Sequence, residues 1–368
     1  MPEDWRQCRL GDVITLKRGY DLPRQDRKPG RFPVVSSAGV TGWHDVAKAR
    51  GPGVVTGRYG TLGDVHFVRE DYWPLNTSLY VEDFKGNDPR FISYFLRGLD
   101  FGTRNAAGAV PGVNRNHLHA MQVTLPPVDT QQLISRVLAA FDDLIENNSR
   151  RILILEGMAR ALYREWFVHL RFPGHETVAV AESAVGRVPQ HWAVKKLGEV
   201  LALNYGKALK HASRREGAVP VFGSSGVVGF HDKSMVEGPG LIIGRKGNVG
   251  SVFYSETAFY PIDTVFYVTS SLPLRYLYYD LLTKNFINSD AAVPGLSRRQ
   301  AYSLQIAVPP NEVLEPFGAM VDVFDGQATV LQRQNDILRR TRDLLLPSLM
   351  SGQLKLRGPK ASAEGAAA

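Results

Sequence analysis

Cysteine is almost absent from this chain of 368 residues, where Cys8 is the only one. A single cysteine excludes an intrachain disulfide framework and a metal site built from several cysteines. The chain also lacks any apolar stretch close to the roughly 18 residues of a membrane span, and residues 1–6 include no apolar core of a signal peptide. The sequence therefore predicts a cytoplasmic protein without a membrane segment.

Motifs for nucleotide binding and catalysis are missing as well. The loops 57–63 and 244–250 have glycine at every third position, which fits neither the dinucleotide fingerprint GxGxxG nor a phosphate loop ending in Gly-Lys-Ser/Thr. The Pro-Pro pairs follow Leu125 and Val308, whereas amino-methyltransferases place Asn or Asp before theirs. No nuclease-like cluster of carboxylates with lysine stands out. We expect no catalytic residue and no cofactor in this chain.

Two histidines occupy equivalent places in the two halves of the chain. His44 and His231 each lack a second His, Cys or carboxylate at a recognised metal-binding spacing. A structural role beside the neighbouring aromatic residue, Trp43 or Phe230, is the expected one. The sequence predicts no metal site.

The composition is that of a globular protein, with 44% hydrophobic, 10% aromatic and 22% charged residues. The length exceeds the roughly 250 to 300 residues at which a single core usually stops growing, so two folded units are expected. Lys and Arg outnumber Asp and Glu by 44 to 36, and the pI is about 9.5. This excess favours a polyanionic partner, although a mildly basic protein without one has a similar composition.

An internal repeat organises the chain. At a spacing of 187 residues Trp5 falls on Trp192, and one half of the sequence aligns with the other. The aligned segments are 32–44 with 219–231, 51–63 with 238–250 and 73–77 with 260–264, and, at a spacing of 183 residues, 110–113 with 293–296 and 125–127 with 308–310. Each half begins with short β-rich runs separated by Gly and Pro and ends with a long unbroken segment typical of a helix.

Both long segments carry a heptad pattern. Its rows are Ile134, Phe141, Asn148, Leu155, Leu162 and Leu138, Ile145, Ile152, Ala159, Trp166 in the first segment, and Phe317, Phe324, Leu331, Leu338, Leu345 and Val321, Ala328, Asn335, Arg342, Leu349 in the second. One apolar seam per helix predicts an intramolecular antiparallel coiled coil of roughly 35 residues or about 50 Å, in which Asn148 and Asn335 help to fix the register. Arg342 in the seam keeps open the alternative that each helix packs only on its own domain.

The glycine-rich loops contain basic residues in both halves. Arg58 and Tyr59 lie in the first loop, and Arg245 and Lys246 lie in the second. Glycine at these positions permits tight turns and a close approach of the backbone to phosphates. DNA contact and a plain β-turn are the two interpretations.

Further candidates for DNA contact recur at similar places in the repeat. They are the basic clusters Lys17, Arg18, Arg24, Arg27 and Lys207, Lys210, Arg214, the residues Asn114, Arg115, Ser297, Arg298 and Arg299 after the aligned Pro-Gly segments, and the serine pairs Ser36, Ser37 and Ser224, Ser225. Arg and Asn match the edges of guanine and adenine, and recurring basic clusters suit phosphates. A solvated surface, a helix cap or a turn is the alternative for each group.

Two β-rich repeats that each end in Pro-Pro and continue into a heptad helix resemble the specificity subunit of type I restriction-modification enzymes. The segments 162–168, 192–200 and 342–352 look like further parts of that family's pattern. The resemblance implies an α+β fold with two β-rich target-recognition domains in tandem pseudo-repeat, each followed by a long helix. The implied boundaries are 1–127 for the first domain, 128–170 for the first spacer helix, 171–190 for a linker, 191–310 for the second domain, 311–356 for the second spacer helix and 357–368 for a disordered tail.

The resemblance also implies a non-catalytic role in DNA recognition. Each domain would read one half of a split asymmetric site in double-stranded DNA, and the coiled coil would act as a ruler between the halves. The implied partners are two modification subunits, which methylate adenine with S-adenosylmethionine, and restriction subunits, which use ATP and Mg²⁺. The alternatives are a methylation-only system, a protein-binding scaffold and an unrecognised enzyme.

Overall fold

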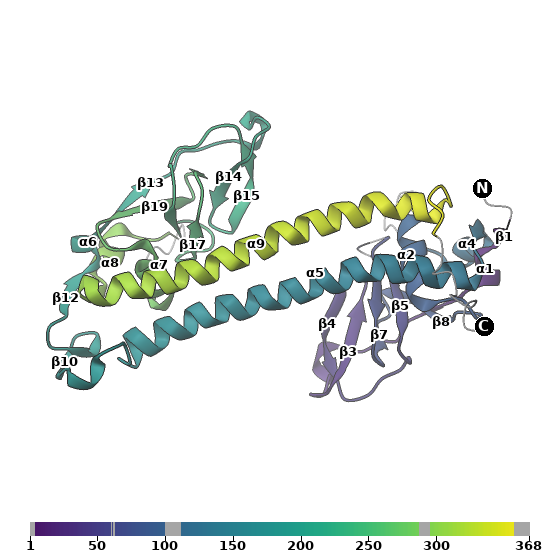
Figure 1. Cartoon of the computed structure of the whole chain (residues 1–368), viewed down its shortest axis with the longest axis horizontal. Coiled ribbons are helices and arrows are strands. Elements are labelled where there is room, and N and C mark those ends of the chain that lie inside the picture. The colour runs from purple at the N-terminus through teal and green to yellow at the C-terminus, as the bar shows by residue number, and fades with distance from the viewer. Residues whose placement is uncertain (1–3, 60, 62, 100–111, 287–294, 357–368) are drawn as a thin grey trace, which may run out of the picture. The chain divides into compact units, whose positions relative to one another are not determined.

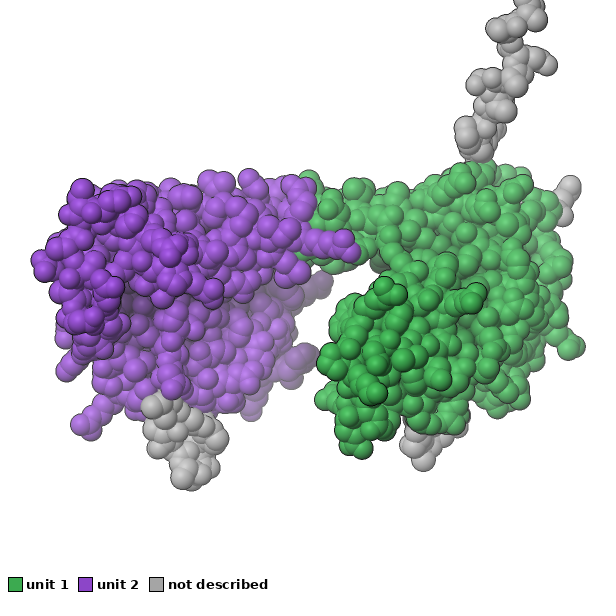
Figure 2. All heavy atoms as spheres, turned by 90° about the horizontal axis from the view of Figure 1, so that it is seen from below, with its two compact units in different colours: residues 1–149, 332–368 green, residues 150–331 purple. Residues whose placement is uncertain are grey.

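The computed structural model describes residues 4–59, 61, 63–99, 112–286 and 295–356. It divides into two compact units, each of which combines a β-rich domain with parts of both long helices. Unit 1 consists of residues 1–149 and 332–368, and unit 2 consists of residues 150–331 (Figure 2). The division between the units therefore crosses both helices.

The β-rich domain of unit 1 is built from small sheets. A four-stranded sheet has the order β2-β8-β5-β6, a three-stranded sheet has the order β4-β3-β7, and β1 pairs with β9. The strands are β1 (Arg6–Arg9), β2 (Thr15–Arg18), β3 (Phe32–Ser36), β4 (Gly39–His44), β5 (Gly53–Gly57), β6 (Val65–Val68), β7 (Trp73–Pro74), β8 (Ser78–Asp83) and β9 (Gln122–Leu125). Helices α1 (Leu10–Val13), α2 (Pro89–Gly98) and α4 (Arg115–Ala120) accompany these sheets.

The β-rich domain of unit 2 repeats this arrangement. Its sheets have the orders β13-β19-β16-β17, β15-β14-β18 and β12-β20. The elements are β12 (Ala193–Lys196), α6 (Leu197–Val200), β13 (Leu201–Tyr205), β14 (Val219–Gly223), β15 (Gly226–His231), β16 (Gly240–Gly244), β17 (Val252–Ser255), β18 (Tyr260–Pro261), β19 (Val265–Ser270), α7 (Leu274–Thr283), α8 (Arg298–Ser303) and β20 (Gln305–Val308). The same strand orders in both units confirm the tandem repeat predicted from the sequence.

The central strands β5 and β16 are buried over their whole length. Successive side chains of a strand point to opposite faces, and both faces are covered. Val54 of β5 lies in the large core of unit 1, whereas Val55 lies in a smaller core with Tyr72. Leu241 and Ile242 of β16 are divided between two cores of unit 2 in the same way. Burial on both faces explains why these strands are uniformly apolar instead of alternating.

The two long helices are α5 (Val128–Tyr163) and α9 (Asn311–Met350), shown in Figure 1. Within unit 1 they run antiparallel. Asn335 donates a hydrogen bond to Ser149 (Nδ2–Oγ 3.2 Å), and Arg342, further along α9, donates to Asp142, further back along α5 (Nη1–Oδ1 2.5 Å). Arg342, whose charge in the seam left the alternative to a coiled coil open, therefore has a carboxylate partner on the opposite helix.

Within unit 2 the other ends of the same helices pack through aromatic side chains. Tyr163 near the end of α5 lies beside Phe317 near the start of α9, with 6.3 Å between ring centroids, and both share a core with Ala159 and Val321. Every seam position predicted from the heptads is buried or partly buried. The antiparallel coiled coil is thus confirmed within each unit.

The segment after α5 has more structure than the sequence analysis expected. Helix α5 ends at Tyr163, and a π-helical turn occupies Arg164–Val168 before residue 170. The range 171–190, expected as a linker, contains a 3-10 turn at His175–Thr177 and the hairpin of β10 (Val180–Ser183) and β11 (Gly186–Pro189). Helix α9 ends at Met350, and the expected tail 357–368 lies outside the described residues.

Candidate nucleic-acid interface

In both units the glycine-rich loop is joined to the segment after the aligned Pro-Gly sequence. In unit 1 the amide of Val113 donates to the carbonyl of Arg58 (2.9 Å), and in unit 2 the amide of Leu296 donates to the carbonyl of Arg245 (2.8 Å). A single β-bridge accompanies each bond. The glycine-rich loop and the segment after the Pro-Gly sequence, about 50 residues apart in sequence, therefore lie side by side. In unit 1 Arg18, at the end of β2, lies next to both.

In each unit we call the surface formed by the glycine-rich loop, the segment after the Pro-Gly sequence and the end of the first sheet strand the basic edge, and in unit 1 it surrounds a pocket. Its volume is about 610 Å³, and its lining includes Arg18, Arg58, Tyr59, Asn114 and Arg115. The Arg58 guanidinium lies 4.5 Å from the centroid of the Tyr59 ring and donates to its hydroxyl at 3.2 Å. Among the described residues none of these three arginines forms an ion pair with a carboxylate. The pocket is strongly positive and suits an anionic group such as a phosphate.

The basic edge of unit 2 is organised around an aromatic ring. The guanidinium carbons of Arg245 and Arg298 lie 5.2 Å and 4.1 Å from the centroid of the Tyr205 ring. Arg245 also donates from Nε and Nη2 to the carbonyl of Asp263, at 3.1 Å and 2.7 Å. A hydrogen bond from Arg298 lowers the pKa of the Tyr205 hydroxyl below its ordinary value. Both arginines are therefore held in place before any ligand arrives.

Two predicted contact residues form helix caps. Asn114 accepts a hydrogen bond from the amide of Asn116 at the start of α4, and Ser297 accepts one from the amide of Gln300 at the start of α8. The capping alternative describes these two side chains. Arg115 and Arg298 occupy the first position of the two helices, beside the basic edge.

Several members of the basic clusters have partners within the protein. Lys17 forms an ion pair with Glu82 (2.6 Å) on the neighbouring strand. Arg27 donates to the carbonyl of Thr41 (2.9 Å), and Arg214, its counterpart, donates to the carbonyl of Val228 (2.6 Å). These contacts give the three side chains structural roles, and their predicted contact with DNA stays a prediction. Besides Arg18 and Arg115, the exposed basic candidates for which no ion pair is seen among the described residues are Arg24, Lys207, Lys210, Lys246 and Arg299.

Glycine occupies the strand positions next to Arg27 and Arg214, in β4 and β15. Gly42 has φ +152° and Gly229 has φ +140°, and a Cβ added to either would lie 2.9 Å or 2.6 Å from the Nη1 atom of the arginine. The Nη1 atom of each arginine therefore lies close to the β4 or β15 backbone. The same contact in both units holds the long loop after β2 or β13 against the hairpin.

The serine pairs differ between the two units. Ser36 and Ser37 are buried, and the Ser36 hydroxyl donates to the carbonyl of Gly39 within the β3–β4 turn. Ser225 is exposed, and its hydroxyl accepts a hydrogen bond from Asn248 of the glycine-rich loop (3.2 Å). The first pair therefore shapes a turn and does not line the accessible surface, whereas the second joins the hairpin turn to the basic edge.

The histidines have the expected structural role but a different aromatic neighbour. His44 accepts a hydrogen bond from the amide of Lys28 (3.1 Å) and lies 5.2 Å from the Trp73 ring, edge to face. His231 lies in the same way against Tyr260. The expected neighbours Trp43 and Phe230 are instead exposed, because adjacent residues of a strand point to opposite faces.

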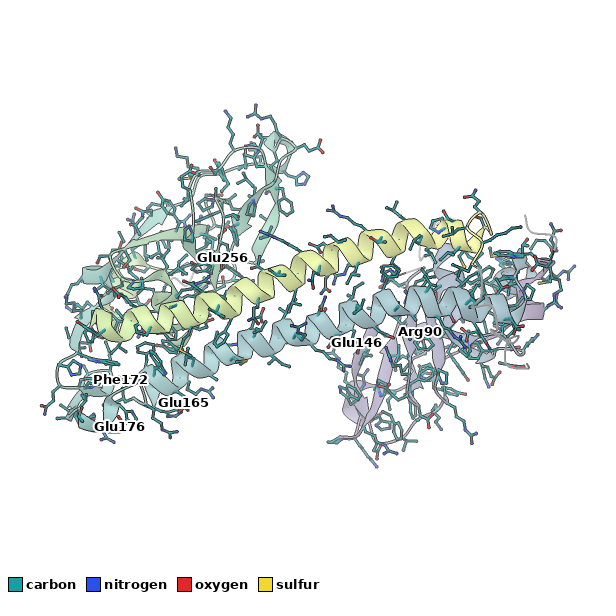
Figure 3. The ribbon with its side chains drawn as sticks, viewed as in Figure 1. Arg90, Glu146, Glu165, Phe172, Glu176 and Glu256 are labelled. Atoms are coloured by element: carbon teal, nitrogen blue, oxygen red, sulfur yellow. The ribbon has the colours of Figure 1, made fainter. Side chains whose placement is uncertain are left out.

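Each β-rich domain is tied to the helix pair of its own unit by a partly buried arginine that sequence reasoning missed. Arg90 of α2 forms an ion pair with Asp143 of α5 (2.7 Å), and Arg275 of α7 forms one with Asp325 of α9 (2.5 Å) and another with Glu256 (2.5 Å); Figure 3 labels Arg90 and Glu256. Burial raises the pKa of Asp325, an effect that Arg275 opposes. Both arginines therefore fix the β-rich domain against the long helices within its unit.

The described residues contain no group of three or more His, Cys, Asp or Glu side chains that could hold a metal ion. In the same part of the chain, no helix has the length and hydropathy needed to cross a bilayer.

Comparisons with known proteins agree with this architecture. Residues 2–156 and 189–337 match the family model described as the type I restriction modification DNA specificity domain. The specificity subunit of the type I restriction enzyme MjaIX from Methanocaldococcus jannaschii is 25% identical over 302 residues, which cover 72% of this chain and 67% of that protein. A putative type I specificity subunit of Mycoplasma pneumoniae is 18% identical over 333 residues, covering 86% and 88%.

A solved structure shows the same fold. The crystal structure of the type I restriction-modification S subunit from M. genitalium superimposes with a TM-score of 0.61 at 19% identity, and the match covers 94% of this chain and 96% of that one. The family model matches both halves of the repeat, at the two β-rich domains and most of both long helices. The chain belongs to the type I restriction-modification DNA specificity domain family.

Proposed function

We propose that this chain recognises DNA for a type I restriction-modification complex and that each β-rich domain reads one half of a split, asymmetric site. The observation that carries the proposal is the repeated basic edge, in which Arg58 is bridged to the Arg115 segment and Arg245 to the Arg298 segment. Arginine is the commonest partner of guanine edges and contacts phosphates as well. Like scaffolds with unlike side chains suit two unlike half-sites.

The helix pair supports a spacer role. Helix α5 has 36 residues and α9 has 40, and a helix of that length extends about 54 to 60 Å, or roughly 1.5 to 1.8 turns of B-DNA. The buried seam makes the pair stiff, because each helix covers the apolar face of the other. The length of the pair would set the number of unread base pairs between the half-sites.

Exposed apolar residues on the two helices support docking of modification subunits. Ile154 in unit 2 and Ile337 in unit 1 are 61% and 64% exposed and occupy equivalent places in the repeat. Leu153, next to Ile154, and Leu344, about two turns after Ile337, are also exposed. Apolar side chains that gather on a surface mark sites of protein contact. One such face in each unit fits two modification subunits, with restriction subunits joining the assembly.

The chain would supply specificity without chemistry of its own. S-adenosylmethionine, ATP and Mg²⁺ would act in the partner subunits. Methyl transfer or DNA cleavage by the purified chain with these cofactors would contradict this part of the proposal.

Base-resolution mapping of adenine methylation tests the central claim. Host DNA is compared with and without the chain, in the presence of the modification subunit. A split, asymmetric motif that disappears on deletion is the expected result. An unchanged methylation pattern, together with a purified assembly that does not bind DNA selectively, would favour a protein-binding scaffold.

Matched shortening of both helices tests the spacer. Removing the same whole number of turns from the α5 and α9 seams should change the gap between the half-sites and leave both half-sites as they were. Altered half-sites with an unchanged gap would contradict the role of the helices as a ruler. The docking faces are tested separately. Ile337→Asp in unit 1 and Ile154→Asp in unit 2 should each weaken the binding of one modification subunit, as measured by native mass spectrometry.

A further inference from the structure

One position separates the basic edges of the two units. Tyr205, the last residue of β13, is the repeat counterpart of Arg18, the last residue of β2. In unit 2 the Tyr205 ring lies under Arg298, with the guanidinium carbon 4.1 Å from the ring centroid. In unit 1 Arg115, the counterpart of Arg298, lies beside the cation of Arg18 in an open pocket. The same scaffold thus presents a ring-supported arginine in one unit and an arginine among like charges in the other.

The ring restricts the plane of the Arg298 guanidinium. Stacking on an aromatic face leaves the N–H groups in the plane of the guanidinium free to donate, and a side chain held in this way loses less entropy when it binds. The contacts of Arg298 within the protein are a long bond from Nη1 to the carbonyl of Leu203 (3.4 Å) and hydrogen bonds to the hydroxyls of Tyr205 and Tyr302. A planar fork of donors fits the O6 and N7 acceptors of guanine.

Arg245 is less suited to reading a base. Its Nε and Nη2 atoms both donate to the carbonyl of Asp263, so two of its three nitrogens are already engaged. Its charge remains available for a phosphate. The two arginines over Tyr205 therefore divide into one that can present a fork and one that can contribute mainly charge.

We propose that Arg298, supported by the Tyr205 ring, reads a guanine in the half-site of unit 2, and that the exchange of Tyr205 for Arg18 makes the two units read different bases. The inference rests on the DNA recognition proposed above. Arg298 is the specificity-determining residue, and Tyr205 is a positioning residue that acts through it.

Single base-pair substitutions test the proposal. The split motif is first mapped with the wild-type assembly, and binding is then measured to duplexes that carry each substitution. Arg298→Lys keeps the charge but loses the fork. It should lower the preference for guanine at one position of one half-site by about 5- to 100-fold, with the other half-site and non-specific binding unchanged. Arg115→Lys is the matched variant in unit 1 and should leave that position unaffected.

Variants at position 205 test the positioning role. Tyr205→Phe keeps the ring and should retain the guanine preference, whereas Tyr205→Ala should lose it as Arg298→Lys does. A uniform loss of affinity for all duplexes in Arg298→Lys would mean a phosphate contact and would overturn the inference, as would full discrimination in Tyr205→Ala. A wild-type assembly without any sequence preference would overturn the proposed function itself.

Discussion

The two β-rich domains share their internal contacts and differ at their exposed edge. In both units an arginine of the long loop, Arg27 or Arg214, donates to the backbone of the adjacent hairpin, and a histidine accepts a backbone amide. At the edge, Arg18 in one unit is replaced by Tyr205 in the other. Repeated side chains with internal partners thus mark the scaffold, and exposed positions that differ mark candidates for recognition.

The helix pair shows a second contrast. Its polar seam residues Asn148, Asn335 and Arg342 all belong to unit 1, whereas the unit 2 part of the seam is apolar and aromatic. Polar groups in a seam reduce stability but favour one register over others. Register is therefore controlled mainly from unit 1, while unit 2 contributes more apolar burial.

The largest effect is expected for the arginines that tie each domain to the helices. Arg275→Met should lower the free energy of unfolding by about 3 kcal/mol, because it leaves clustered carboxylates without their cation. Arg90→Met should cost about 1 kcal/mol, since the Arg90 side chain is 22% exposed against 11% for Arg275 and its partner Asp143 keeps Arg69. Urea denaturation measures both, and equal losses would remove this difference between the units.

A smaller effect, on DNA affinity, is expected for Arg58 and Arg245, which occupy equivalent positions in the two basic edges. Arg58→Gln and Arg245→Gln should each weaken DNA binding by the assembled complex about tenfold and reduce the slope of log affinity against log salt by about one. Arg187→Gln, on the exposed hairpin strand β11, makes the same change of charge away from the edge and serves as the control. Unchanged affinity at two salt concentrations would rule out the phosphate role.

Asn335→Leu makes the unit 1 part of the seam more like the apolar part in unit 2. Asn335 is buried, and its Oδ1 atom has no hydrogen-bond partner among the described residues. Replacing this group with an apolar one should raise the free energy of unfolding by about 1 kcal/mol. The reverse change Leu331→Asn, at the repeat counterpart of Asn148, places an amide in the apolar seam of unit 2 and should lower the free energy of unfolding. A loss of stability in Asn335→Leu would show that the amide stabilises the pair.

A pH-dependent difference is expected from His119. Its Nε2 accepts a hydrogen bond from the amide of Leu16 (2.9 Å), while in unit 2 the hydroxyl of Tyr302 accepts the equivalent bond from Leu203 (2.9 Å). Burial and the nearby charges of Arg115 and Lys85 lower the pKa of His119. The stability from this lowered pKa is present above the ordinary value of about 6.5 and is lost as the pH falls through the lowered value.

Exchanging the two acceptors tests this difference. His119→Tyr should weaken the dependence of unfolding free energy on pH between about pH 7 and 5, and Tyr302→His should introduce such a dependence in unit 2. Denaturation at several pH values measures both variants. An identical pH profile for wild type and His119→Tyr would contradict the assignment.

The smallest effect is expected for the pair of Lys17 and Glu82. Unit 2 has Asn204 and Thr269 in the same places, joined by a side-chain hydrogen bond of 3.1 Å. The double variant Lys17→Asn with Glu82→Thr should change the unfolding free energy by less than about 0.5 kcal/mol, because exposed ion pairs contribute little. DNA affinity should also be unchanged. A marked loss of affinity would return Lys17 to the DNA interface.

Tyr205 shows what the sequence analysis missed at the interface. A single tyrosine at the end of a strand carries no signal by itself, and the alignment of Arg18-Gly19-Tyr20 with Tyr205-Gly206-Lys207 placed it opposite an arginine without indicating which arginines surround it. Arg90 and Arg275 were missed for a similar reason, since their carboxylate partners lie about 50 residues away. Such pairings depend on how the chain folds back on itself.

The sequence by itself determined the repeat, the β-rich character of both domains and the heptad seams, because these are periodic or local patterns. The tertiary structure decided which basic side chains are free. Lys17, Arg27 and Arg214 have partners in the fold, while Arg58 lines a pocket with Arg115 in unit 1 and Arg245 lies with Arg298 over Tyr205 in unit 2. Whether a charge is available to DNA depends on neighbours distant in sequence, and only the folded chain brings those neighbours together.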